Sequence, residues 1–222
     1  MGVGVLILGE SGTGKSTSLR NFNEGEIGVL NVAEKPLPFK KRLTLCNTSD
    51  YKMIKDTIKQ SNLRAYAVDD AGYLLQFENF NRSSERGFDK FTEMAVHFKS
   101  LLDAVREADP NTITYIMAHP QIGDNGKMQM KTIGKMLDNQ LSIEGLFTVV
   151  LVAEKDEEGY HFITNGDVNS PAKSPMGMFD EAKIDNDLKL VDSTIREYWG
   201  LAPLSDKPAP KPAPKKAETK NE

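Results

Sequence analysis

The sequence predicts an α/β fold, a three-layer sandwich in which helices cover both faces of a mostly parallel central sheet. Two observations predict it. Short apolar runs recur along the chain with the length of buried strands, and segments with helical spacing of apolar residues separate them. Five runs have the composition of strands: Val3–Leu8, Ile27–Ala33, Arg64–Val68, Thr112–Ala118 and Phe147–Ala153.

Helices are expected in most of the intervening segments. The predicted helices are Lys15–Phe22, a segment capped by Ser49 or Asp50 and continuing to Asn62, Phe91–Val105, and a closing helix over Leu188–Trp199. Asp156–Gly159 has the composition of a hairpin turn that leads into a further strand, Tyr160–Ile163. The polar segment Glu78–Gly87 is expected to be a loop.

Composition and charge exclude some classes of protein. The chain has 222 residues, a net charge of −4 and one cysteine, so an intramolecular disulfide is excluded and the charge gives no support for nucleic-acid binding. We expect one domain over residues 1–200 and a disordered tail rich in Pro, Ala and Lys over 201–222. No apolar run approaches the ~20 residues that span a bilayer, and no secretory leader is evident. We therefore expect a cytoplasmic protein with no membrane association.

The strongest motif follows the first predicted strand. Its pattern is G-x-x-x-x-G-K-[ST], the phosphate-binding loop or P-loop, in which glycines let the backbone N–H groups point at phosphate oxygens. A lysine at this spacing reaches the β- and γ-phosphates, and the following hydroxyl ligates Mg²⁺. The residues expected to bind a nucleoside triphosphate are Gly9, Glu10, Ser11, Gly12, Thr13, Gly14, Lys15, Ser16 and Thr17.

Polar residues follow three of the other predicted strands. Asp69 and Asp70 end the run Tyr66–Asp70, and an acid there can hold Mg²⁺ beside the P-loop. We assign this role to Asp69; the alternative is that the two acids cap the next helix. Because carboxyl ends of parallel strands share one edge of a sheet, Glu34 can also reach the γ-phosphate side and activate water, a role for which Asp70 competes.

The fourth predicted strand is followed by His119-Pro120-Gln121. Either His119 or Gln121 can lie near the γ-phosphate and respond to its loss. The plainer interpretation of His119 is an exposed or hydrogen-bonded surface residue. The histidines show no spacing typical of a metal site.

The order of these motifs resembles the RecA-like ATPases, and most closely the phage-encoded, core-only members described as AAA-family ATP-binding proteins. The resemblance spans residues 3–200, although only the P-loop is highly specific. It implies that Glu34, which closes the strand after the P-loop helix, is the catalytic glutamate, and that Gln121 or His119 reads the γ-phosphate. Some of these proteins are associated with single-strand annealing and recombination.

The resemblance also implies partners. It places mobile DNA-contacting loops at Gly123–Met136, where lysines can neutralise phosphates of single-stranded DNA, although this segment lacks the aromatic residues that usually stack on bases. It implies a homo-oligomer with nucleotide between subunits, to which a lysine or arginine of one subunit contributes in trans. The basic residues concerned are Lys127, Lys131 and Lys135 for DNA, Lys173 in trans, and Arg82 and Arg86 as weaker trans alternatives.

The leading hypothesis is a Mg²⁺-dependent ATPase that acts on single-stranded DNA in phage recombination or replication. A nucleotide or small-molecule kinase is the second, but kinases usually have an arginine-bearing lid, and only Arg82 and Arg86 share a predicted loop. A third is a nucleotide-gated binding module with little turnover, which needs no water-activating acid.

Overall fold

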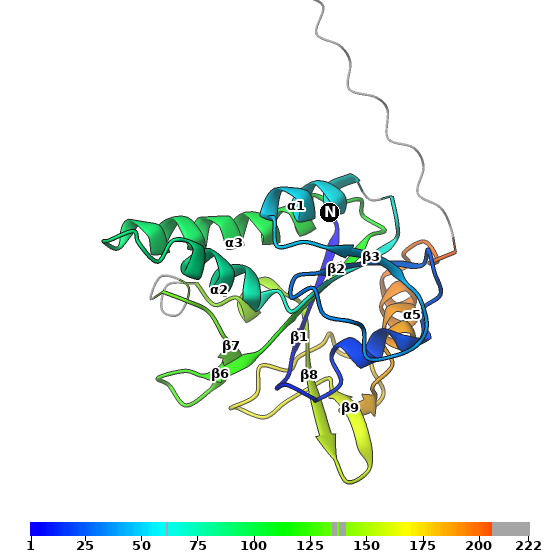
Figure 1. Cartoon of the computed structure of the whole chain (residues 1–222). Coiled ribbons are helices and arrows are strands. Elements are labelled where there is room, and N and C mark those ends of the chain that lie inside the picture. The colour runs from blue at the N-terminus through cyan, green and yellow to red at the C-terminus, as the bar shows by residue number, and fades with distance from the viewer. Residues whose placement is uncertain (61, 135–136, 138–140, 206–222) are drawn as a thin grey trace, which may run out of the picture.

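The computed structural model describes residues 1–60, 62–134, 137 and 141–205. Its main sheet has eight strands in the order β10-β9-β8-β1-β5-β4-β2-β3, and β6 and β7 form a separate ribbon (Figure 1). The strands are β1 (Val3–Leu8), β2 (Ile27–Asn31), β3 (Thr44–Asn47), β4 (Ala65–Asp69), β5 (Ile113–Ala118), β6 (Pro120–Ile122), β7 (Met128–Met130), β8 (Val149–Asp156), β9 (Gly159–Ile163) and β10 (Lys183–Asp185). Among these eight strands, only β9 runs opposite to the others, and it pairs antiparallel with β8 on one side and β10 on the other. The mostly parallel sheet confirms the predicted α/β class.

Helices cover both faces of this sheet. They are α1 (Tyr51–Gln60), α2 (Gly72–Asn81), α3 (Asp89–Glu107) and α5 (Leu188–Trp199), with the 3₁₀ helices η1 (Ser16–Asn21) and η2 (Glu144–Leu146). Alternate residues of the central strands face opposite ways, so Leu6 packs with α1, α2 and α3, and Ile7 packs with η1 and α5. Both faces of the sheet are therefore buried, as a three-layer sandwich requires (Figure 1).

The strand order decides which loops meet. Strand β5 pairs in parallel with β1 on one side and with β4 on the other. The carboxyl ends of these three strands therefore lie side by side. The residues that follow them are Gly9, Asp70 and His119.

Several predicted elements differ in extent. The helix expected over Lys15–Phe22 is the short 3₁₀ helix η1. Leu19 in this helix and Phe22 directly after it are three residues apart, the repeat of a 3₁₀ helix, and both are buried. Strand β2 ends at Asn31 rather than Ala33. The loop expected over Glu78–Gly87 is wrong at its start, because α2 continues to Asn81.

Other elements were not predicted. Strands β3, β6, β7 and β10 have three or four residues each, too few for a periodic signal. The mobile loop expected over Gly123–Met136 is in part the β6–β7 hairpin, where Gly123 N donates to Lys127 O. The expected tail also begins too early, since Leu201 and Leu204 pack against the core; residues 206–222 lie outside the described residues.

Candidate functional site

The P-loop connects β1 to η1, and two of its glycines have backbone angles that side chains disfavour. Gly12 has φ of 83° and Gly14 has φ of 93°. Gly9 is restricted differently: a Cβ there would lie 2.5 Å from Thr13 Oγ1 and 2.8 Å from Ala153 O. The loop conformation therefore depends on glycine at three positions.

Lys15 lies inside the curve of this loop. Its Nζ donates to Gly9 O at 2.6 Å and to Glu10 O at 2.9 Å, and the residue is 6% exposed. Burial lowers the pKa of Lys15, while the nearby carboxylates of Asp70 and Asp69 act in the opposite direction. The loop thus holds an ammonium group that is largely removed from water, where its attraction for an anion is strong.

The next side chain joins the P-loop to β4. Ser16 Oγ donates to Asp69 Oδ1 at 2.9 Å. Asp69 is 3% exposed, and burial, followed by the charge of Asp70, raises the pKa of its carboxyl group, with the Ser16 hydrogen bond acting in the opposite direction. The Ser16 hydroxyl and the Asp69 carboxylate therefore lie side by side, joined by a hydrogen bond.

These two oxygens fit a magnesium ion that also binds a nucleotide. Within the described ranges, no group of three or more His, Cys, Asp and Glu side chains forms a metal site on its own. Mg²⁺ usually takes one or two protein carboxylates and completes its shell with water and substrate phosphates. Ser16 and Asp69 are the residues that could supply the protein share of such a shell.

Asp70 occupies the centre of the site. It adopts a left-handed backbone conformation, with φ of 59°, which is unusual outside glycine. One carboxylate oxygen forms an ion pair with Lys35 Nζ, and the other lies 3.4 Å from His119 Nε2. Asp70 therefore bridges the loop after β2 and the end of β5.

Lys35 reaches Asp70 because the loop after β2 is fixed at its base. The buried Asn31 side chain donates from Nδ2 to Lys35 O and to Asn47 Oδ1, both at 2.8 Å. The hydrogen bond to Asp70 raises the pKa of Lys35, so this side chain stays cationic. Lys35 was not predicted as a site residue, although it directly follows Glu34.

His119 projects from the end of β5 beside these groups. Burial, and then the positive charge of Lys15, lowers its pKa, so the imidazole is neutral at neutral pH. The ring of Tyr73 in α2 packs edge-on against it, with centroids 6.1 Å apart. This packing limits the orientations of the imidazole.

Except for Gly9 and Asn31, which support the loops, these residues line one cavity of about 400 Å³. Its lining is Ser11, Gly12, Gly14, Lys15, Ser16, Thr17, Lys35, Pro36, Pro38, Asp69, Asp70, Tyr73, His119 and Tyr160. The fold therefore brings most of the predicted site residues together. It adds Lys35, Tyr73 and Tyr160, for which the sequence offers no motif.

Some predicted residues lie elsewhere. Glu34 is exposed, has φ of 55° and is not among the residues that line the cavity. Gln121 lies in β6 opposite Gln129 and is not among them either. Glu10 and Thr13 shape the loop, since Thr13 Oγ1 donates to Glu10 O at 2.9 Å.

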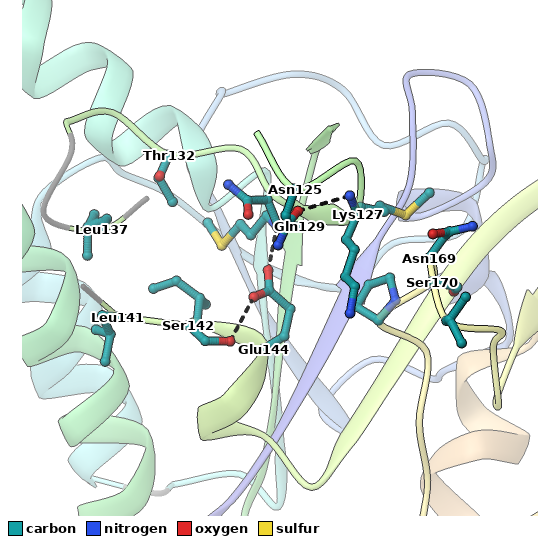
Figure 2. A pocket seen from close by; sticks show the side chains of 15 residues that line it. Asn125, Lys127, Gln129, Thr132, Leu137, Leu141, Ser142, Glu144, Asn169 and Ser170 are labelled. Atoms are coloured by element: carbon teal, nitrogen blue, oxygen red, sulfur yellow. Dashed lines mark hydrogen bonds between the residues drawn. The ribbon is translucent and has the colours of Figure 1, made fainter. Parts of the chain in front are cut away.

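A second cavity of about 360 Å³ lies beside the β6–β7 hairpin (Figure 2). Leu137 and Leu141 lie at one end of it, and Asn169 and Ser170 lie at the other. The carboxylate of Glu144 in its wall accepts hydrogen bonds from Met130 N and Ser142 Oγ. This cavity contains Lys127 but none of the phosphate-loop residues.

The basic residues predicted to contact DNA or a neighbouring subunit lie in several different segments of the chain. Lys127 and Lys131 are exposed at the end of the β6–β7 hairpin and just after it, and Lys135 lies outside the described residues. Lys173 is half-buried, and its backbone bridges to Val150 in β8. Arg82 is held by ion pairs to the carboxylates of Glu78, Glu85 and Glu93, so it is less available to a neighbour than Arg86.

The comparisons with known proteins add no family. No family model matches the chain, and no curated protein matches it. Among the described residues, no helix is both long enough and apolar enough to cross a membrane. The site itself therefore carries the functional argument.

Proposed function

We propose that this chain is a Mg²⁺-dependent P-loop ATPase of the RecA-like type. The observation that carries the proposal is the convergence of the loop Gly9–Ser16, the Ser16–Asp69 contact, Asp70 and His119 on one cavity. Backbone N–H groups and a lysine for phosphates, a hydroxyl and an acid for a metal, and a further acid are the parts that nucleoside triphosphate hydrolysis needs.

Each group near the loop has one role in this proposal. The backbone of Gly12–Thr17 cradles the α- and β-phosphates, and Lys15 reaches from the β- to the γ-phosphate. Ser16 and Asp69 hold Mg²⁺, which supplies charge neutralisation for the phosphate oxygens when it is bound. Burial of Lys15 and Asp69 strengthens these interactions because the site has a low local dielectric.

Water activation is assigned to Asp70. Of the two acids that the sequence offered, Asp70 lines the cavity, whereas Glu34 is exposed and is absent from its lining. A general base must come within hydrogen-bond reach of the attacking water. The Lys35 ammonium pairs with Asp70 before nucleotide arrives, and the γ-phosphate competes for that same cation.

His119 supplies the link to a second site. Its side chain lies near Asp70, while its carbonyl accepts a hydrogen bond from Lys131 N at 2.8 Å, just after the β6–β7 hairpin. In this proposal, a movement of His119 on loss of the γ-phosphate is transmitted to the hairpin through this hydrogen bond. The exposed Lys127 and Lys131 in this region are the proposed contacts to single-stranded DNA, together with Lys135.

The same proposal includes self-assembly. ATP bound between neighbouring subunits, with Lys173 of one reaching the phosphates of the next, makes hydrolysis change the packing of subunits and their hold on DNA. The biological setting proposed is phage recombination or replication.

Turnover measured with and without single-stranded DNA tests the proposal. Hydrolysis of Mg²⁺·ATP that rises with DNA and is abolished in Lys15→Ala supports it, with oligomeric state followed by light scattering. Equal activity with and without DNA contradicts the DNA half. Binding without turnover in the wild-type protein favours a nucleotide-gated module, and transfer of labelled phosphate to a nucleoside monophosphate favours a kinase.

A further inference from the structure

We propose that Tyr160, in β9, is the stacking surface for the base of the bound nucleotide. This inference rests on the proposed nucleotide binding and extends it from the phosphates to the nucleoside. No sequence motif points to Tyr160; its place in the folded chain does.

The cavity has two chemically different ends. Asp69, Asp70 and His119 lie at one end, where β4 and β5 finish. A P-loop orients a triphosphate, because its backbone binds the α- and β-phosphates and its lysine reaches the β- and γ-phosphates. The γ-phosphate therefore points toward the acids, and the nucleoside leaves on the side of the loop away from them.

Tyr160 lies on that side, because β9 follows β8 on one side of β1, whereas β5 and β4 lie on the other side. A Cβ on Gly14 would lie 2.9 Å from Tyr160 Cδ1 and 3.2 Å from Asn186 Oδ1, so the ring packs directly against the loop backbone. Tyr160 lines the same cavity as Thr17, although it belongs to the hairpin that follows β8. The phosphate loop and an aromatic ring thus form one continuous surface.

The ring is also accessible. Tyr160 is 44% exposed, and the Lys155 ammonium lies over one face of the ring, 5.0 Å from its centroid. Lys155 and Tyr160 are directly opposite each other in the β8–β9 hairpin, so the paired strands hold the two side chains next to each other. A base would stack on the ring face opposite Lys155, where it meets an aromatic surface that is favourable for a π-system.

Stacking of this kind accepts any base, since every base has a π-face. Tyr160 therefore adds affinity for a nucleoside triphosphate over bare triphosphate. It does not by itself choose adenine over guanine.

Calorimetric titration with two ligands tests this inference: Mg²⁺·ATP and Mg²⁺·tripolyphosphate, which has the phosphates but no base. We expect Tyr160→Ala to weaken ATP binding on the order of 10-fold and to leave tripolyphosphate binding unchanged. Tyr160→Phe keeps the ring and is expected to bind ATP as the wild type does. Tyr198→Ala, which removes a tyrosine of similar exposure in α5, is the matched control.

The outcomes separate the two proposals. Wild-type protein that binds neither ligand overturns the nucleotide-binding function itself. Wild-type protein that binds both ligands equally well, or a Tyr160→Ala variant that weakens both equally or weakens neither, overturns the role of Tyr160 while phosphate binding stands.

Discussion

The Ser16 hydroxyl donates to Asp69 Oδ1 at 2.9 Å and so connects the phosphate loop to the end of β4. The two residues are 53 positions apart. They meet because β5 inserts between β1 and β4 and brings the three strand ends to one edge. This contact defines the proposed metal site, and the first prediction concerns the acid within it.

Asp69→Asn is expected to abolish Mg²⁺-dependent nucleotide binding and to remove a pH dependence of stability. Burial raises the pKa of Asp69 above its ordinary value of 3.8. The folded state then holds a proton that the unfolded state releases, so without metal the stability falls as pH rises through this window. Denaturant unfolding of metal-free protein at a series of pH values, starting near the ordinary pKa of 3.8 and rising from there, measures it.

The opposite sign applies to metal binding. Mg²⁺ needs the ionised carboxylate, so its affinity in the presence of ATP should fall as pH drops toward the raised pKa of Asp69. Asp69→Asn should show neither trend. Identical stability profiles for the variant and the wild type contradict the assigned burial effect.

The second prediction separates the two acids that compete for water activation. Asp70→Asn is expected to lower the turnover number by about 100-fold or more, the usual contribution of a general base. Glu34→Gln is expected to leave turnover close to the wild-type value, because Glu34 is exposed and absent from the cavity lining. Steady-state hydrolysis assays, with nucleotide affinity measured separately, give the comparison. A large loss in Glu34→Gln alone restores the glutamate that the family resemblance implied.

These residues also show where prediction from sequence ends. The P-loop and the two acids at the end of β4 are predictable because local patterns carry them: a spaced glycine motif, and an apolar run that ends in carboxylates. Glu34 and Lys35 are neighbours in the same short turn, yet only Lys35 lines the cavity. The direction of each side chain depends on the left-handed backbone at Glu34 and on Asn31, whose side chain joins Lys35 O to Asn47 in β3.

The fold shows the same division. Strand β1 is apolar throughout and was predicted with its observed bounds. Helix α2 was missed because apolar and polar residues do not separate onto two faces, and only its first half packs into the core. The short strands β3 and β10 exist through their pairing with β2 and β9, which lie outside any local sequence window. Strands β6 and β7 pair with each other in a hairpin, but each is too short to show a period.

The third prediction concerns the Lys35–Asp70 ion pair. Lys35→Ala removes a positive charge that lowers the pKa of His119. It also removes the ion-pair partner of Asp70, so the negative charge of Asp70 acts on His119 without being offset. Both changes favour the imidazolium, so the pKa of His119 should rise toward its ordinary value of 6.5. Titration of the imidazole proton resonances by NMR measures it, with the more distant His97 as an internal reference.

Lys35→Arg keeps the charge and is the matched control; its His119 titration should follow the wild type. An unchanged pKa in Lys35→Ala means that the two groups do not interact across the cavity.

The fourth prediction concerns stability away from the site. Tyr115 Oη donates to Asp192 Oδ2 at 2.8 Å, and Arg196 Nε donates to Oδ1 of the same buried carboxylate. Asp192→Ala leaves the Arg196 guanidinium buried beside no counter-charge and should cost about 3–5 kcal/mol in the free energy of unfolding. Tyr115→Phe should cost about 1 kcal/mol. Asp103→Ala, which breaks surface pairs with Lys99 and Arg106, should change stability by about 0.5 kcal/mol or less.

The fifth prediction compares two glycines with the same backbone angle. Gly12 and Gly25 both have φ of 83°, and no atom lies within 4 Å of a Cβ built on either. Alanine at either position strains the backbone by about 1–2 kcal/mol, so both variants should lose similar stability in denaturant unfolding. Of the two, only Gly12 lines the cavity of the candidate site. Only Gly12→Ala should therefore lose affinity for Mg²⁺·ATP, because the N–H groups of the loop around Gly12 are the ones that must point at phosphate. Equal affinities in the two variants contradict the assignment of this loop as the phosphate cradle, since their folding cost is matched.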